Sequence, residues 1–96
     1  MSLFVVEHEH SEATCPARDP QMAQMLLQHL SKPNAADYGI EIHGEGVIDG
    51  GHRLFLILDA QDPVKVTEFM APFAMAGTVE VLPASRCETV VARAGC

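Results

Sequence analysis

The chain has 96 residues, of which 48% are hydrophobic and 20% are charged, and its formal net charge is −7. This length and composition suit one small globular domain rather than a disordered chain. The six basic residues are scattered, which argues against binding to nucleic acid or to an anionic membrane surface. No apolar run approaches the roughly 18 residues of a membrane-spanning helix, and with no signal peptide evident the expected location is the cytoplasm.

The first half of the chain predicts a strand followed by a helix. The apolar, β-branched run at residues 3–6 is typical of a buried strand. Asp19 and Pro20 mark a helix start, because Asp can cap free backbone N–H groups and Pro loses nothing at the first helical position. This helix is expected to cover residues 21–31 and to end at the "KPN" of residues 32–34.

The second half predicts a hairpin, a second helix and further extended segments. Residues 38–60 contain two apolar strands joined by a tight "DGG" turn at residues 49–51. An Asp-Pro pair at residues 62–63 repeats the helix-start signature, and Pro72 should kink or shorten that helix. The remaining predicted elements are a core strand at residues 78–83 and a further extended segment at residues 88–93.

The predicted order of elements resembles the ferredoxin-like βαββαβ fold. More narrowly, the chain is similar to the dimeric α/β-barrel superfamily. Within it, short bacterial chains of unassigned function carry "VEH" at the end of the first strand and "DA…DP" at the entry to the second helix, here at residues 6–8 and 59–63. The resemblance implies one α+β domain over residues 1–96, with a four-stranded antiparallel sheet in the order 4-1-3-2. Helices on one face and an extra C-terminal extended segment complete this expected fold.

The same resemblance implies a homodimer, and one such relative is associated with nickel binding. A general argument also favours the dimer. Helices on one face of a sheet leave the other face uncovered, and the predicted strands are apolar on both sides. We therefore expect two copies to associate through the open sheet face.

An insertion separates the first predicted strand from the first predicted helix. Phe55 precedes Asp62 by 7 positions, whereas Phe4 precedes Asp19 by 15 positions. The eight extra residues fall in a loop at about residues 9–18. Because a tight turn does not need these residues, the loop is a candidate functional segment.

Residues in and around this loop have the chemistry of metal ligands. His8 and His10 are two positions apart, so both side chains point to one side of an extended strand. Imidazole nitrogen and the thiolate of Cys15 are preferred ligands of Ni, Cu, Zn and Co. In the sheet order that the resemblance implies, His52 lies at the same edge, and Cys96 could return to it. The sequence therefore predicts a transition-metal site formed from His8, His10, Cys15, His52 and Cys96.

Simpler interpretations of the same residues stay open. A loop rich in His and Glu is often only solvated, Cys15 can be an ordinary turn residue, and Cys87 suits a buried, inert thiol. The odd count of three cysteines disfavours a disulfide framework. His43 lies either in the lining of a cleft or, as we favour, on the solvent face of a strand. His29, in the last turn of a helix, is expected to be structural.

Three functions are compatible with these features. The first is a small transition-metal-binding protein, with metal-dependent chemistry if a coordination position is open. The second, implied by the superfamily, is a cofactor-independent isomerase or monooxygenase. It would hold a small apolar substrate in a cavity, with His43 or His52 as acid or base. The third is a non-catalytic dimeric module. The sequence leaves open the metal, the substrate and the role of Cys87.

Overall fold

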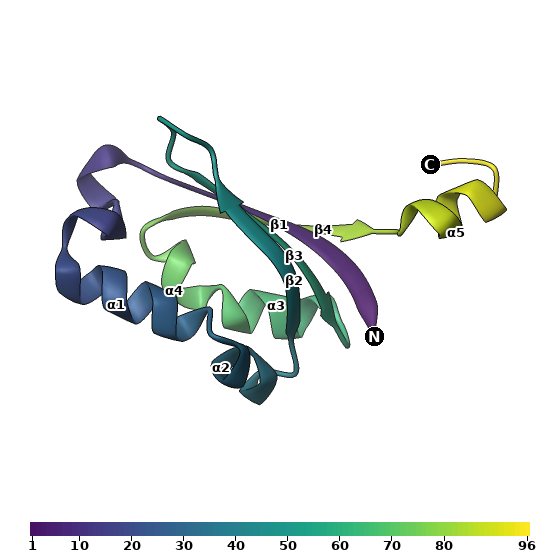
Figure 1. The fold of residues 1–96 in the computed structure, drawn as a ribbon, viewed down its shortest axis with the longest axis horizontal. Helices are drawn as coiled ribbons and strands as arrows, with labels where there is room; N and C mark the ends of the chain where they lie inside the picture. The colour runs from purple at the N-terminus through teal and green to yellow at the C-terminus, as the bar shows by residue number, and fades with distance from the viewer.

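The computed structural model describes residues 1–96 and contains one four-stranded sheet with helices packed against one face (Figure 1). Its order is β2-β3-β1-β4, and every neighbouring pair is antiparallel. This is the predicted order 4-1-3-2 counted from the opposite edge, so the ferredoxin-like α+β fold is confirmed. The strands are β1 Ser2–His10, β2 Glu41–Val47, β3 Arg53–Ala60 and β4 Gly77–Ala84.

The helices begin and end where local sequence chemistry requires. Asp19 caps the first helix and Asp62 caps the third, each accepting hydrogen bonds from backbone N–H groups of the first turn. Pro72 follows a break between two short helices, as predicted. None of the helices has the length and apolar character that a membrane crossing requires. They are α1 Pro20–His29, α2 Lys32–Asp37, α3 Pro63–Phe69, α4 Ala71–Ala74 and α5 Cys87–Ala92, and two 3-10 turns, η1 Glu12–Thr14 and η2 Pro16–Arg18, precede α1.

Two segments differ from the sequence prediction. The first helix was predicted to reach residue 31 and to end at "KPN", but α1 ends at His29. The "KPN" run instead opens α2, because Pro33 lies in the first turn, where its missing N–H is not needed. Residues 88–93 were expected to be extended, yet most of them form α5. Beyond the end of β4 the chain leaves the sheet and meets no strand to pair with. Helical bonds such as Val90 N–H to the Arg86 carbonyl (3.1 Å) therefore satisfy its backbone.

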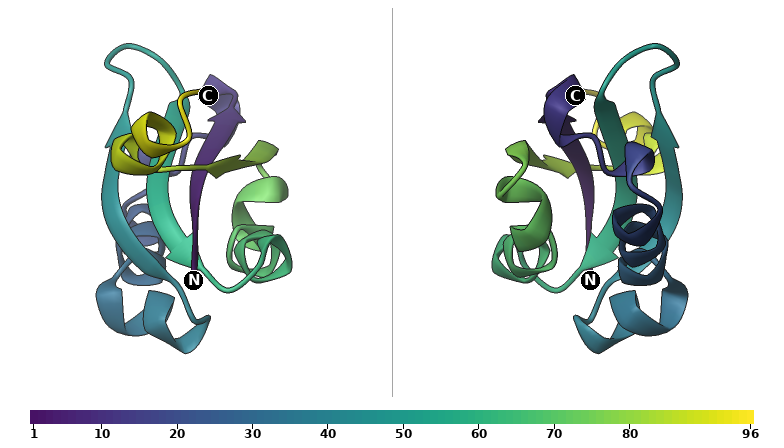
Figure 2. Two further views of the ribbon diagram at one scale, coloured as in Figure 1. Left: turned by 90° about the vertical axis from the view of Figure 1, so that its right-hand side faces the viewer. Right: turned by 90° about the vertical axis from the view of Figure 1, so that its left-hand side faces the viewer.

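The hydrophobic core lies between the sheet and helices α1–α4. Side chains alternate along a strand, and the even-numbered positions of β1 and β3 are the buried ones. Odd-numbered side chains point to the opposite face. The helices α1–α4 leave this face uncovered (Figures 1 and 2). The core residues include Phe4, Val6, Leu54, Leu56, Leu58, Val66, Phe69, Met70 and Phe73.

A β-bulge changes the faces of the edge strand β2. The sequence pattern placed Glu41, His43 and Glu45 on one face, but the register shifts between Ile42 and Gly44. Glu41 pairs with Asp59 on the open face, whereas Glu45 pairs with the buried Leu56. The two glutamates therefore lie on opposite faces, because one extra residue reverses the alternation.

Candidate metal centre

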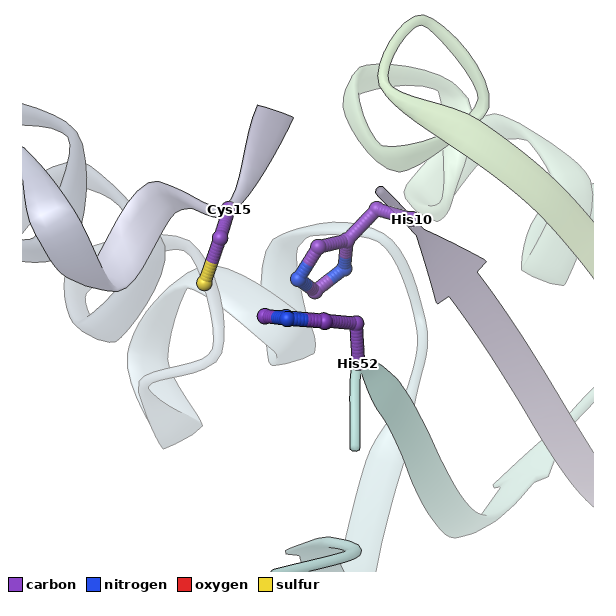
Figure 3. Close-up of side chains that lie close together, drawn as sticks. All are labelled: His10, Cys15 and His52. Carbon is purple, nitrogen blue, oxygen red and sulfur yellow. The ribbon is translucent and has the colours of Figure 1, made fainter. Parts of the chain in front are cut away.

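Three potential ligand side chains from separate segments converge at the end of β1 (Figure 3). His10 is the last residue of β1, His52 immediately precedes β3, and Cys15 lies between the turns η1 and η2. One ligand atom from each residue lies within 4.8 Å of the other two, and all three residues are partly buried. Ligand atoms around one tetrahedral ion are roughly 3.5 Å apart. A small contraction of this cluster would therefore suffice to hold a metal ion.

Backbone pairing and the loop's own hydrogen bonds place these residues. The backbone N–H of His10 donates to the carbonyl of His52 at 3.0 Å, which joins the end of β1 to the start of β3. The Thr14 hydroxyl donates to the Ala76 carbonyl at 3.0 Å. This bond ties the turn that carries Cys15 to the segment entering β4. The loop is thus fixed at both ends, next to the two histidines.

His8 lies behind His10 in a chain of hydrogen bonds. Its Nδ1 is 2.9 Å from the backbone carbonyl of Thr78, which can only accept, so this nitrogen carries the proton. In the neutral ring, Nε2 of His8 then has the lone pair, and it lies 3.1 Å from Nδ1 of His10. His10 must therefore donate from Nδ1, which leaves a lone pair on its Nε2.

That nitrogen of His10 is the unpaired polar atom of the site. Nε2 of His10 is buried and has no hydrogen-bond partner. A buried acceptor without a partner costs about 1–3 kcal/mol, and a metal ion would satisfy it. Burial lowers the pKa of His10, and the neighbouring rings of His8 and His52 lower it further. Each of these causes favours the neutral imidazole, the form that binds metals.

The structure therefore brings together three of the five residues predicted as ligands. His8, which is 3% exposed, has its two nitrogens engaged by Thr78 and His10. Cys96 does not return to this edge, because α5 projects from the opposite end of the sheet (Figure 1). Its carbonyl instead accepts a hydrogen bond from Arg93 at 2.9 Å. Cys87 is exposed at the start of α5, not buried as predicted.

A second polar group lies on the open face of the sheet. Nε2 of His43 is 2.7 Å from Oδ2 of Asp59, and Arg86 donates to the same oxygen at 3.0 Å. The hydrogen bond from His43 lowers the pKa of Asp59 most, burial acts in the opposite direction, and Arg86 lowers it again. Glu41 is close enough to complete a metal-ligand set. The Asp59 carboxylate is already paired, however, so this group lacks the unsatisfied atom found at His10.

The histidines expected in the enzyme interpretation do not line the apolar cavity of the molecule. This cavity lies between α1 and α4, and neither His43 nor His52 reaches it. The histidine that does reach it is His29, whose Nε2 donates to the Phe69 carbonyl at 2.7 Å. Its other nitrogen accepts from the amide of Asn34 at 3.3 Å. Both nitrogens of His29 are engaged within the fold, which fits the structural role expected of it.

Two of the groups that organise these sites have no signature in the sequence. Thr78 acts through its backbone carbonyl, which has no side-chain signature. Arg86 follows β4, which β1 separates from β3, so its contact with Asp59 depends on the path that the chain takes after the sheet.

Comparisons with known proteins place the chain in one family. A family model described as a domain of unknown function (DUF3303) matches residues 2–95. No curated protein and no solved structure matches the chain. The association with nickel that the sequence resemblance implied therefore stays a prediction.

Proposed function

Because the chain belongs to the DUF3303 family, whose domain has no assigned function, we propose a function from the site itself. The protein binds one transition-metal ion through Nε2 of His10, the thiolate of Cys15 and a ring nitrogen of His52. The observation that carries this proposal is the buried, unpaired Nε2 of His10. It carries a lone pair, and His10 is grouped with Cys15 and His52 as a potential ligand set.

Each residue around the ion has a distinct task. Cys15 and the two ring nitrogens form a mixed sulfur and nitrogen set, which suits Ni, Cu, Zn or Co. His8 is a positioning residue, since it orients the ring of His10 and fixes its tautomer. Three protein ligands leave one tetrahedral position for water or a small molecule. The site therefore supports either metal handling or a metal-assisted reaction.

Cobalt substitution combined with elemental analysis tests the proposal. Protein purified without chelator would be loaded separately with Ni, Cu, Zn and Co under reducing conditions, and its metal content measured. We expect one ion per chain, with a thiolate-to-cobalt absorption band in the Co form. His10→Ala, Cys15→Ser and His52→Ala should each lose the ion.

Two control variants remove the same residue types elsewhere. His43→Ala and Cys96→Ser should retain the full metal content. Absence of bound metal under all four loading conditions would reject the proposal and leave the non-catalytic module in its place. Equal loss of metal in the control variants would show that the ion is bound at another part of the chain.

We also propose that the chain forms a homodimer through the open face of the sheet. This face carries Leu3, Val5, Phe55, Ile57 and Leu82. Ile57 and Leu82 are 46% and 43% exposed in the single chain. The helix α5 extends beyond the sheet (Figure 1), and its Val91 is 77% exposed. Burial of this apolar surface against a second copy would be favourable.

A cytoplasmic location stays a prediction, in keeping with the free thiol that the site requires.

A further inference from the structure

An apolar cavity lies between α1 and α4, on the helix side of the sheet. Its volume is about 210 Å³. Met22, Met25 and Leu26 of α1 line one side, and Pro72 and Phe73 of α4 line the other. The two methionines are 48% and 62% exposed, whereas Phe73 is 8% exposed. The cavity thus has a buried aromatic base and flexible, partly exposed thioether side chains that can adapt to an occupant.

The polar side chains that line the cavity are already hydrogen-bonded within the fold. His29 uses one nitrogen for the Phe69 carbonyl and the other for the amide of Asn34, and its ring stacks on Phe69 at 4.6 Å. The Thr14 hydroxyl donates to the carbonyl of Ala76. No lining side chain therefore offers an uncommitted hydrogen-bonding group. An occupant would gain mainly from apolar contact.

We propose that this cavity binds a small apolar molecule of about the size of one aromatic ring. An enclosed apolar cavity of about 150 Å³ holds benzene. This cavity is larger but open to solvent beside Met22 and Met25, so it has room for a ring whose small substituent points outward. The rings of His29 and Phe73, whose centroids are 5.8 Å apart, would contact a ring edge-on or by stacking. The methionine sulfur atoms add favourable contacts with an aromatic ligand.

The proposal does not depend on the metal site, although the two are neighbours. Thr14 and Pro16 line the cavity, and Cys15 lies between them in sequence. An occupant would pack against the turn that carries this cysteine. The cavity can nevertheless be tested on protein free of metal, so the two proposals stand or fall separately.

Methyl resonances of the methionines provide the test, with toluene as the probe. The chain has five methionines, and Met22 and Met25 line the cavity. Met1 and Met75 are 74% and 90% exposed and serve as internal controls. Titration of toluene into metal-free, methyl-labelled protein should shift the Met22 and Met25 signals to saturation. The signals of the two control methionines should not move.

Variants that fill the cavity make the test specific. Ala76→Leu, or Leu26→Phe if the first variant folds poorly, should weaken toluene binding roughly tenfold, because the added atoms occupy the space. Ala74→Leu makes the same change on the exposed side of α4 and should bind normally. Equal shifts at all exposed methionines, or no saturation, would overturn the proposal. So would Met22 and Met25 signals that move with protein concentration alone, because a second copy would then fill the cavity.

Discussion

The two histidines at the end of β1, His8 and His10, have different tasks because each imidazole has two nitrogens. His8 uses one for the Thr78 carbonyl and one for His10, so neither is free. His10 uses only Nδ1, and its remaining nitrogen is buried without a partner. The Thr78 carbonyl thus fixes the tautomer of His8, and His8 in turn fixes the tautomer of His10. As a result, Nε2 of His10 is the nitrogen that is free to bind a ligand. The pattern His-X-His therefore supplies one proposed ligand and one supporting residue.

Replacement of His8 tests this division of tasks. His8→Leu introduces an apolar residue of similar volume at this buried position and removes the acceptor for Nδ1–H of His10. All three proposed ligands remain, and we expect metal affinity to fall about 10–100-fold, measured by competitive zinc titration. Glu9→Gln, on the other face of the same strand, should leave the affinity unchanged. An unchanged affinity in His8→Leu would mean that His10 is oriented by other contacts.

The ion pair on the open face predicts a pH dependence of stability. His43 and Arg86 hold the pKa of Asp59 below its usual range, which is about 3.9 in an unfolded chain. The carboxylate then stabilises the folded state fully above about pH 4, and this contribution is lost as the pH falls through the lower folded pKa. Asp59→Asn should lower the free energy of unfolding in urea at pH 5, and the difference from wild type should shrink near pH 2. A difference that stays constant between these pH values would contradict the assignment.

At the scale of elements, the approach of β4 to β1 depends on one glycine. A Cβ atom built on Gly77 would lie 1.9 Å from the carbonyl oxygen of Glu9, a clash with backbone that no rotamer can relieve. Gly77 pairs with His10 and precedes Thr78, whose carbonyl holds His8. The start of β4 is therefore part of the support of the site.

Gly77→Ala should destabilise the fold and loosen the histidine chain. We expect the free energy of unfolding to fall by about 1–3 kcal/mol and metal affinity to fall with it, measured by urea unfolding and metal titration. Gly46→Ala in β2 is the matched control, because its added Cβ would meet no atom within 4 Å. If the Gly77→Ala variant were as stable as the control, β4 could move away from β1 without loss of stability, and the glycine would not be required.

The elements that were predictable from sequence are those that local chemistry determines. The Asp-Pro helix starts, the break before Pro72 and the buried alternation of β3 all depend on residues within a few positions. The helix α5 and the bulge in β2 were not predictable in this way. Each depends on whether a strand finds a neighbour and in which register. The convergence of His10 with His52 followed from the sheet order, whereas the supporting position of His8 depended on a backbone carbonyl 70 residues away.

At the scale of the whole molecule, the helices protect only one face of the sheet. On the uncovered face, Val5 lies between Ile57 of β3 and Leu82 of β4. These neighbours form an apolar centre, flanked by the ion pairs of Arg53 with Glu7 and of Arg86 with Asp59. An apolar centre with a charged rim is the usual composition of a protein–protein interface.

A charge in this centre should therefore separate the proposed dimer. Wild-type protein at micromolar concentration should sediment at twice the chain mass, and Ile57→Glu at the chain mass, because the dimer would have to bury an unpaired carboxylate. Val64→Glu places the same charge on α3, at a residue that is 62% exposed, and should remain dimeric.

His10, Cys15 and His52 all belong to one chain, so monomeric Ile57→Glu should still bind metal. A wild-type protein that sediments as a monomer would remove the dimer while leaving the metal site intact, since the two depend on opposite faces of the sheet.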